Sequence, residues 1–281
     1  MDLHTALAAI ILGLVEGMTE FLPISSTGHL ILTASVLHWV GDKAKVFEIA
    51  IQGGAMLAVI WHFRVRLIAT MQAMVSPEAS ERERASHFAR NLCIAFVPAA
   101  LLGLAFASAI KRYLFAPEPV ALAFIAGAVV ILWAEGRQDR VGAVRVNSVD
   151  AMSALDALKV GVAQAFALIP GTSRSGATII GGMLFGLSRV AATEFSFFLA
   201  IPTLLAATIY DVVKHRSVLG VGDLPSFALG TAVSFLSALV VVRWLLRYVA
   251  AHSFVPFAWY RLAFGGLVLL TARMGWVDWA H

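Results

Sequence analysis

The chain has 281 residues, of which 60% are hydrophobic and 14% charged, and its formal net charge is +4 at pH 7. An ordinary soluble domain carries roughly 25% charged residues. The composition therefore excludes a soluble domain and indicates a polytopic membrane protein. The sequence has no patch in which basic and aromatic residues gather, so we expect no nucleic-acid partner.

The first half begins with an apolar segment that is broken in the middle. Residues 3–21 and 29–40 are mostly apolar, and the loop 23–28 separates them. Neither limb clearly reaches the ~20 apolar residues that a membrane-spanning helix needs. We therefore expect a re-entrant hairpin, because irregular backbone at membrane depth is tolerated only within protein or beside water.

Three spans follow this hairpin, and the second half repeats the order. We expect the first three spans at 47–63, 91–110 and 120–133, with a polar loop at 64–90 and a short turn at 111–118. A polar linker at 136–152 precedes a second broken segment, whose limbs are at 154–169 and 177–187. The last three spans are expected at 192–213, 226–249 and 254–272, with a loop at 214–224.

The two halves align without a gap when the first is shifted by 148 positions, so that Ser25 falls on Ser173 and Phe47 on Phe195. We interpret the chain as one integral membrane domain made of repeat one at 1–135, the linker, and repeat two at 153–281. Three spans per half is an odd number, so the second half enters from the opposite side and the broken segments meet near the midplane. The predicted fold is all-α, an inverted-topology repeat with about six transmembrane helices and two re-entrant hairpins.

Basic residues predict the orientation. If the loop 64–90 is cytoplasmic, the cytoplasmic side collects more positive charge than the outer side, as the positive-inside rule requires. The residues expected on the cytoplasmic side are Arg64, Arg66, Arg82, Arg84, Arg90, Arg137, Arg140, Arg145, Arg243 and Arg247. Those expected on the outer side are Lys43, Lys45, Lys111, Arg112, Lys214, Arg216 and Arg273. The first hairpin and both chain ends are then expected to start from the outer face.

The first hairpin carries two acids. Glu16 and Glu20 are four residues apart, so they share one face of a helix. A charge at the centre of a bilayer costs roughly 2.5–3.5 kcal/mol, and a bridging divalent cation would offset that cost. Mg²⁺ binds one or two carboxylates together with phosphate oxygens, and Ca²⁺ is the other candidate. The alternative is that one acid is protonated or caps a helix.

A hydroxyl-rich loop with one histidine follows the acids. Its hydroxyls could simply cap a helix that starts near His29, and His29 could be a buried histidine bonded to a carbonyl. Beside two acids we favour function, with Ser25 and Thr27 binding phosphate. Ser26 could attack phosphorus with a carboxylate or His29 as base, His29 itself could attack, or a metal-activated water could do so.

The second hairpin carries the positive charge of the expected site. The polar residues of the stretch 170–178 that we select are Ser173, Arg174, Ser175 and Thr178. Hydroxyls and the N–H groups at a helix start form an anion cradle. An arginine adds a planar fork that fits a phosphate and stabilises transferring phosphoryl oxygens. A resting salt bridge from Arg174 to Glu16 or Glu20 is compatible with that role.

We expect the acids and the arginine to form one composite site. The 148-position shift places Ser26 on Arg174, so the first hairpin has the acids and the histidine, and the second has the positive charge. Glu48 and Gln52 on the first span either support this site or ligate a cation; ordinary helix packing through residues 53–54 is the alternative. Arg189 and Arg261 are expected to be structural or interfacial. A membrane transporter is the rival function, since inverted repeats with broken helices are a transporter architecture.

Four motifs carry a family resemblance. They are VEGMTEFLPISSTGH at 15–29, FEIAIQGG at 47–54, PGTSRSGATI at 170–179 and EFSFFLAIP at 194–202. Together they resemble the bacterial undecaprenyl-pyrophosphate phosphatases of the bacitracin-resistance type, and the resemblance covers essentially the whole chain.

This resemblance implies an integral-membrane hydrolase that converts undecaprenyl pyrophosphate into undecaprenyl phosphate and inorganic phosphate. It implies a divalent cation, a polyprenyl pyrophosphate substrate, a multi-pass location in the bacterial inner membrane and an active site that faces the periplasm. It also implies a role in lipid-carrier recycling for peptidoglycan synthesis, and bacitracin resistance. A homodimer is a further expectation for the assembly. The nucleophile, the metal, the preferred chain length and lipid flipping stay open from the sequence.

Overall fold

The computed structural model describes residues 1–39, 41–114, 116–138, 140, 142–215 and 220–277. These residues form eleven α-helices and three short 3₁₀ helices, η1 (Val149–Ala151), η2 (Phe166–Leu168) and η3 (Val221–Asp223). The α-helices are α1 (Leu3–Thr19), α2 (Ser26–Val36), α3 (Asp42–His62), α4 (Arg64–Met74), α5 (Ala79–Leu114), α6 (Pro117–Gln138), α7 (Ala154–Ala165), α8 (Arg174–Leu184), α9 (Arg189–His215), α10 (Leu224–Val249) and α11 (Val255–Met274).

Six helices are long and apolar enough to cross a membrane, which confirms the prediction of an all-α polytopic membrane protein. Within the described residues these candidate spans are Lys43–His62, Ala79–Phe106, Pro117–Gln138, Arg189–Tyr210, Leu224–Val249 and Val255–Met274. Each contains most of one predicted span. Of the predicted connections, residue 115 of the short turn, residues 139 and 141 of the linker and 216–219 of the last loop lie outside the described residues, as does residue 40 at the end of the first hairpin.

The prediction of a polar loop at 64–90 is wrong. These residues form α4 and the first turns of α5, which is 36 residues long and carries Glu81 in its first turn. At 1.5 Å per residue α5 measures about 54 Å, well beyond a hydrocarbon core of about 30 Å. The charged residues that indicated a loop therefore lie on helices that extend out of the apolar layer, and Pro77 marks the turn between them.

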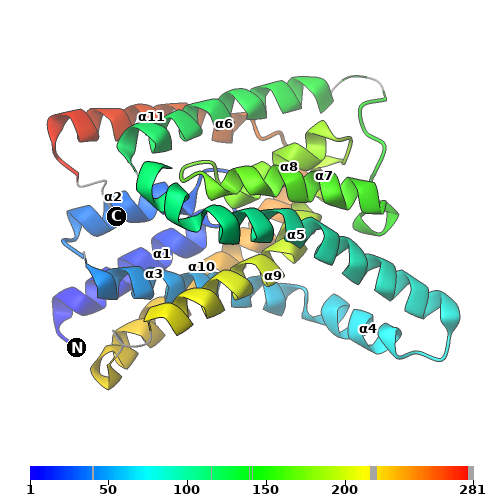
Figure 1. Cartoon of the computed structure of the whole chain (residues 1–281), viewed down its shortest axis with the longest axis horizontal. Helices are drawn as coiled ribbons and strands as arrows, with labels where there is room; N and C mark the ends of the chain where they lie inside the picture. Colours follow the sequence, from blue (N-terminus) through cyan, green and yellow to red (C-terminus); the bar gives the residue numbers. More distant parts are fainter. Residues whose placement is uncertain (40, 115, 139, 141, 216–219, 278–281) are drawn as a thin grey trace.

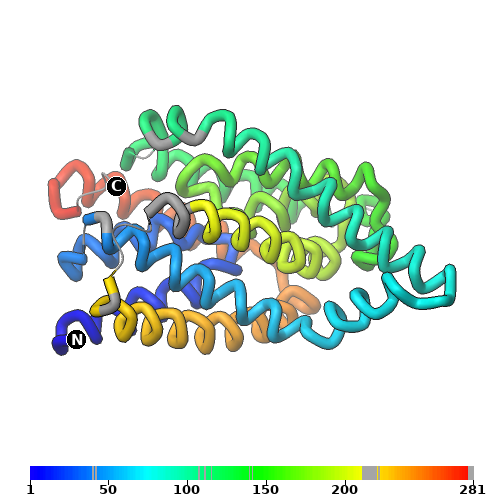
Figure 2. Tube along the Cα trace, turned by 60° about the horizontal axis from the view of Figure 1, so that its bottom comes forward, coloured from blue at the N-terminus to red at the C-terminus, as the bar shows by residue number. Residues whose placement is uncertain are grey.

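The four helices of the two broken segments are short, as expected for re-entrant hairpins. Helix α1 has 17 residues, α7 has 12, and α2 and α8 have 11 each. Figure 1 shows that α1 starts at the end of the molecule where the termini lie, whereas α7 starts at the opposite end. Figure 2 shows the turn between α4 and α5 projecting at that opposite end. This arrangement supports the inverted repeat.

The close contacts of the two hairpins are also equivalent. A Cβ at Gly13 on α1 would lie 2.5 Å from the carbonyl oxygen of Gly230 on α10. A Cβ at Gly161, its counterpart on α7, would lie 2.5 Å from the carbonyl oxygen of Ala95 on α5. Small residues let helix backbones approach this closely inside a membrane. Thus α1 packs on α10 as α7 packs on α5.

The ends of the helices agree with the predicted division of basic residues. Helix α4, the start of α7 and the end of α10 lie toward one end of the molecule, and the start of α3 and the end of α11 lie toward the other (Figures 1 and 2). Arg216, which we assigned to the outer side, lies outside the described residues, and so do the side chains of Lys111 and Lys214.

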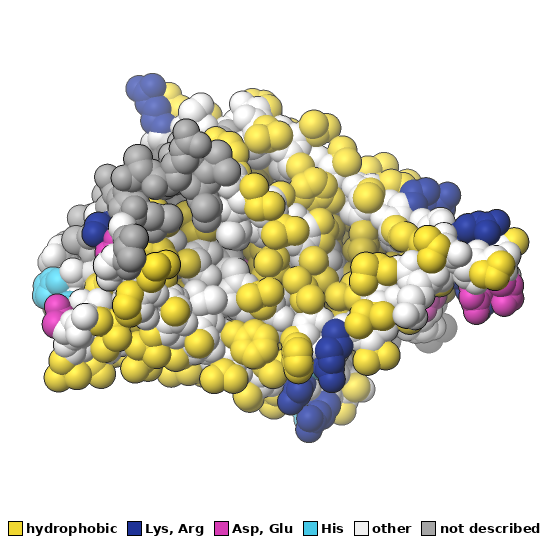
Figure 3. All heavy atoms as spheres, turned by 90° about the horizontal axis from the view of Figure 1, so that it is seen from below, with side chains coloured by type: hydrophobic (Ala, Val, Ile, Leu, Met, Phe, Trp, Pro, Cys, Tyr) yellow, Lys and Arg dark blue, Asp and Glu magenta, His cyan; other side chains and the backbone are white. Residues whose placement is uncertain are grey.

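The middle of the molecular surface is apolar. Figure 3 shows hydrophobic side chains across one face, with charged side chains near its margins. Leu104, Leu236 and Trp259 keep between 61% and 71% of their surface exposed. Such large apolar side chains on many helices form a surface for lipid.

Two adjacent glycines on α3 give a matched test of this packing. A Cβ at Gly54 would lie 2.4 Å from the carbonyl oxygen of Thr231, whereas a Cβ at Gly53 would meet nothing within 4 Å. We expect Gly54→Ala to destabilise the protein by about 1–3 kcal/mol, because α10 must move away. Gly53→Ala should be neutral or slightly stabilising, because alanine is the better helix former. Thermal unfolding in detergent micelles measures both, and equal melting temperatures would contradict the observed packing.

Candidate active site between the two hairpins

Each hairpin turns at a serine with left-handed backbone. Ser25 precedes α2 with a φ of 68°, and Ser173 precedes α8 with a φ of 72°. A positive φ at a residue other than glycine costs about 1–3 kcal/mol and is concentrated at functional sites. The two serines are equivalent under the 148-position shift. The same turn therefore presents the first residues of both helices to one space between the hairpins.

The two loops bond directly to each other. Ser175 donates a hydrogen bond of 2.7 Å to the main-chain oxygen of Leu22, and Ser173 donates one of 3.3 Å to the same oxygen. Ser173 also caps α8, because its hydroxyl oxygen accepts from the N–H of Gly176 at 3.0 Å. The tips of the two hairpins are thus joined within the protein interior.

Arg261 on α11 fastens both loops to α6. It is 1% exposed, and its guanidinium donates only to main-chain oxygens. These oxygens belong to Pro23, Ala123, Phe124, Gly171 and Thr172, at 2.9–3.2 Å. Five carbonyls match the five N–H donors of an arginine. The expectation that Arg261 is structural agrees with these contacts.

Glu20 joins the two hairpins through its side chain. Its Oε2 accepts a hydrogen bond of 2.6 Å from the hydroxyl of Ser26, and its Oε1 accepts one of 3.1 Å from Nη2 of Arg174. Nη1 of Arg174 donates to the main-chain oxygen of Ser196 at 3.0 Å. The acid of one hairpin and the arginine of the other are therefore paired, as the composite site requires.

These side chains line a small polar cavity of about 150 Å³. Its residues are Glu20, Ser25, Ser26, Thr27, Gln52, Ala167, Ile169, Pro170, Gly171, Ser173, Arg174 and Leu204. Hydroxyls, an arginine and two helix N-termini surround it, and all three are groups that bind anions. The cavity has the chemistry of a phosphate site.

Glu16 lies one turn before Glu20 and is 1% exposed, and neither of its carboxylate oxygens has a hydrogen-bond partner. Glu20, Glu48 and Arg174 act on it electrostatically. A buried carboxylate without a partner is costly, and its oxygens are the ligand type that Mg²⁺ and Ca²⁺ prefer. Among the described residues, no three His, Cys, Asp or Glu side chains gather closely enough to hold a metal ion by themselves.

His29 does not line the cavity. Its Nδ1 donates to the main-chain oxygen of Ser25 at 2.7 Å, since a carbonyl can only accept. In the neutral ring, Nε2 then accepts a hydrogen bond of 2.6 Å from the hydroxyl of Tyr260. The ring of Phe264 stacks on the imidazole with centroids 4.1 Å apart. Both ring nitrogens are therefore engaged, and the ring is held between aromatic side chains.

A family model supplies the decisive comparison. The model described as "Bacitracin resistance protein BacA" matches residues 9–267. This chain belongs to the BacA family. Curated relatives named undecaprenyl-diphosphatase cover it almost completely. The one from Herminiimonas arsenicoxydans is 62% identical over 282 residues and 100% of both chains, and the one from Methylibium petroleiphilum is 60% identical over 288 residues and 99% of both.

In this member of the BacA family, the other selected residues divide into two groups. Ser25, Thr27, Ser173 and Gln52 line the cavity. The hydroxyl of Thr178 bonds with that of Ser196 at 2.6 Å, so Thr178 and Ser175 are turned to protein partners instead. Both are fully buried.

The sequence analysis did not select two residues that form hydrogen bonds to the selected side chains. Ser196 on α9 accepts from Arg174 and contacts Thr178, and Tyr260 on α11 bonds to His29. Both are polar residues within apolar spans, which is the one signal that could have selected them. Glu194 on α9 pairs with Arg66 at 2.8 Å.

Proposed function

We propose that this chain hydrolyses undecaprenyl pyrophosphate to undecaprenyl phosphate and inorganic phosphate in the cavity between the hairpins. One observation carries the proposal: a single carboxylate, that of Glu20, bonds both the Ser26 hydroxyl and the Arg174 guanidinium at an anion-binding cavity. The relatives named undecaprenyl-diphosphatase support this substrate. A cavity formed by hairpins within apolar spans suits a lipid that carries a diphosphate head.

The reaction begins at Ser26. Its oxygen attacks the terminal phosphorus while Glu20, which already accepts its hydrogen bond at 2.6 Å, takes the proton. The bond from that phosphorus to the bridging oxygen breaks, and undecaprenyl phosphate leaves. The departing oxygen of undecaprenyl phosphate takes the proton from Glu20, so that Glu20 is a carboxylate again. Water then attacks the phosphoserine and gives a proton to Glu20. The bond from phosphorus to the serine oxygen breaks, and Glu20 returns the proton to that oxygen, so that inorganic phosphate and free Ser26 result.

Arg174 stabilises the phosphoryl oxygens during both steps. A guanidinium placed at a transferring phosphoryl group offsets charge that is spread over its three equatorial oxygens. The contacts with Glu20 and Ser196 fix the direction of the guanidinium before the substrate arrives. Ser25, Thr27 and Ser173 would bind the remaining oxygens, together with the N-termini of α2 and α8.

A divalent cation, Mg²⁺ or Ca²⁺, would be held by Glu16 and Glu20 together with substrate oxygens. The unpaired oxygens of Glu16 support this site, and Mg²⁺ commonly uses one or two carboxylates plus phosphates. When bound, the cation would neutralise charge on the diphosphate. Glu48 on α3 carries a charge of the same sign as that of Glu16, so it would add to the negative potential that attracts the cation.

Glu16→Gln tests the cation site. The amide keeps the shape of the side chain but lacks the charge, so we expect the Mg²⁺ concentration for half-maximal activity to rise at least tenfold. Mn²⁺ binding by electron paramagnetic resonance should weaken in parallel. Glu194→Gln is the control, because Glu194 pairs with Arg66 and not with the site. Unchanged Mn²⁺ affinity in Glu16→Gln would exclude this ligand.

The enzyme is a multi-pass membrane protein, and we propose that it resides in the bacterial inner membrane with its site open to the periplasm. The concentration of arginine at the opposite end of the spans supports this orientation. Recycling of the lipid carrier for peptidoglycan synthesis and bacitracin resistance follow from the reaction. A homodimer is part of the proposal for the assembly.

Phosphate release by the purified protein tests the function. In detergent with Mg²⁺, undecaprenyl pyrophosphate should yield one inorganic phosphate per lipid, and the lipid product should be the monophosphate. Transport of the intact lipid across a proteoliposome membrane, with no phosphate released, would favour a transporter instead.

A further inference from the structure

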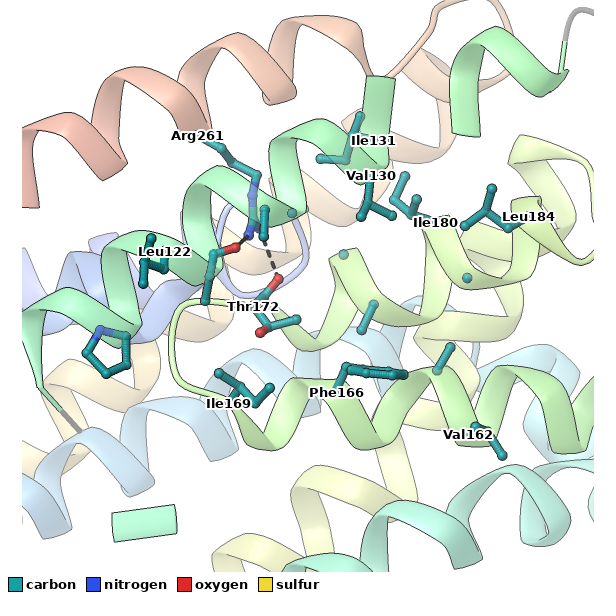
Figure 4. A pocket seen from close by; sticks show the side chains of 18 of the residues that line it. Leu122, Val130, Ile131, Val162, Phe166, Ile169, Thr172, Ile180, Leu184 and Arg261 are labelled. Atoms are coloured by element: carbon teal, nitrogen blue, oxygen red, sulfur yellow. Dashed lines mark hydrogen bonds between the residues drawn. The ribbon is translucent and has the colours of Figure 1, made fainter. Parts of the chain in front are cut away.

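A second cavity, large and apolar, lies beside α6, α7 and α8. Its volume is about 590 Å³, within the ~300–1,000 Å³ that is typical of small-molecule sites. Figure 4 shows Leu122, Val130, Val162 and Ile180 around it. The polar side chains at its wall are those of Thr172 and Arg261, and Arg261 already donates to carbonyl oxygens. The cavity therefore suits an apolar chain and offers little to a polar ligand.

Small residues form part of the cavity wall on both sides. Helix α6 contributes Ala126 and Gly127, and α8 contributes Ala177 and Gly181. A Cβ at Gly127 would lie 2.2 Å from the guanidinium of Arg261, and a Cβ at Gly181 would lie 2.4 Å from the Cβ of Ala163, so both glycines are needed for close packing against their neighbours. The helices around the cavity are therefore tightly packed on one another beside it.

The second re-entrant loop separates this cavity from the polar one. Ile169 lines both cavities. Beyond it, Ser173 and Arg174 face the polar cavity, whereas Thr172 and Gly176 face the apolar one. Only the width of one loop lies between the two cavities, and Ile169 contributes to the wall of both.

We propose that the apolar cavity, here called the chain groove, holds the polyprenyl chain of the substrate. This proposal rests on the proposed function and adds where the chain lies. A membrane phospholipid keeps its phosphate at the membrane surface, but the polar cavity lies at the tips of two hairpins inside the protein. A lipid whose head is bound there begins its chain beside Ile169, at the entrance of the groove.

The groove contributes orientation and chain selection more than affinity. The chain leaves one apolar environment, the bilayer, for another, so little hydrophobic free energy is gained. Packing against a shaped wall fixes the position of the attached head, which favours the reaction. Leu122 and Val130 lie eight positions apart on α6, about 12 Å, so a long chain contacts both and a short chain reaches only the nearer part.

Two adjacent valines on α6 provide the test. Val130 lines the groove, and Val129 is 58% exposed and belongs to the outer face of the same helix. In Val130→Trp, kcat/KM for undecaprenyl pyrophosphate should fall at least tenfold, and kcat/KM for geranyl pyrophosphate should change by less than about twofold. Val129→Trp should leave both values unchanged, and activity on the short substrate shows that each variant is folded.

Two outcomes would overturn the chain groove: equal losses on both substrates in Val130→Trp, or no loss on the long one. If the wild-type protein releases phosphate from neither substrate, the proposed function fails instead. Photo-cross-linking with a benzophenone-tagged polyprenyl phosphate then tests the groove separately. Labelling of α6 and α8 supports it, and labelling elsewhere, or equal labelling by a tagged phospholipid that excess polyprenyl phosphate cannot displace, overturns it.

Discussion

Replacing Arg174 with alanine is expected to lower kcat for phosphate release by about 10³-fold or more, and KM much less. Arginines that stabilise phosphoryl transfer contribute about 10³–10⁵ in rate, and this one is held in position by Glu20 and Ser196. Arg174→Lys keeps a charge but not the planar fork, so a loss of about 10²–10³ is expected for it. Single-turnover kinetics with undecaprenyl pyrophosphate measures the chemical step.

A second variant separates catalysis from folding. Arg174→Ala leaves the Glu20 carboxylate buried without its partner, which costs about 3–5 kcal/mol. The double change Arg174→Ala with Glu20→Gln removes that charge, so its melting temperature should recover while its activity does not. Arg66→Ala is the control, because it removes an arginine that forms two ion pairs, with Glu194 and Asp150, away from the cavity. The double variant also lacks the proposed base, so its melting temperature reports on the buried charge, and recovery of its turnover would refute the roles of both Arg174 and Glu20.

The architecture of this protein can be predicted from its sequence because it depends only on where long apolar runs begin and end. Charges and loop residues interrupt apolar runs, and the 148-position shift shows the interruption twice. The pairing of Arg174 with Glu20, at 3.1 Å, follows from the same reasoning, because buried charges of opposite sign in two hairpins need each other. Helix α4 was missed because charge density was interpreted as loop, although charged residues are common on helices that leave the membrane.

The finer geometry could not be predicted, because it depends on main-chain atoms. The five partners of Arg261 are carbonyl oxygens, which every residue carries and no sequence pattern marks. Ser175 likewise bonds to the main-chain oxygen of Leu22. From the sequence, Ser173, Ser175 and Thr178 are equivalent phosphate ligands, whereas among these three only Ser173 lines the cavity. The turn at Ser173 decides which hydroxyl faces the substrate.

Ser26→Ala is expected to reduce kcat by about 10⁴-fold or more, since loss of an attacking serine costs up to about 10⁶. Ser26 lines the cavity and donates to Glu20 at 2.6 Å. His29 has both ring nitrogens engaged, so His29→Gln should lose about tenfold or less. Thr27→Ala, which removes the neighbouring hydroxyl, is the matched control and should resemble His29→Gln.

Trapping the intermediate identifies the attacking group directly. Acid quenching after mixing with substrate labelled in its terminal phosphate should leave label on the peptide that contains Ser26, and none in Ser26→Ala. Phosphoserine survives acid, whereas phosphohistidine does not, so alkaline quenching distinguishes attack by His29. A Ser26→Ala enzyme within about tenfold of wild type, equal to roughly 1.4 kcal/mol of barrier, would exclude the serine. Water activated by Glu20 or by a cation would then be the nucleophile, and the bond between Ser26 and Glu20 would serve only to orient the carboxylate.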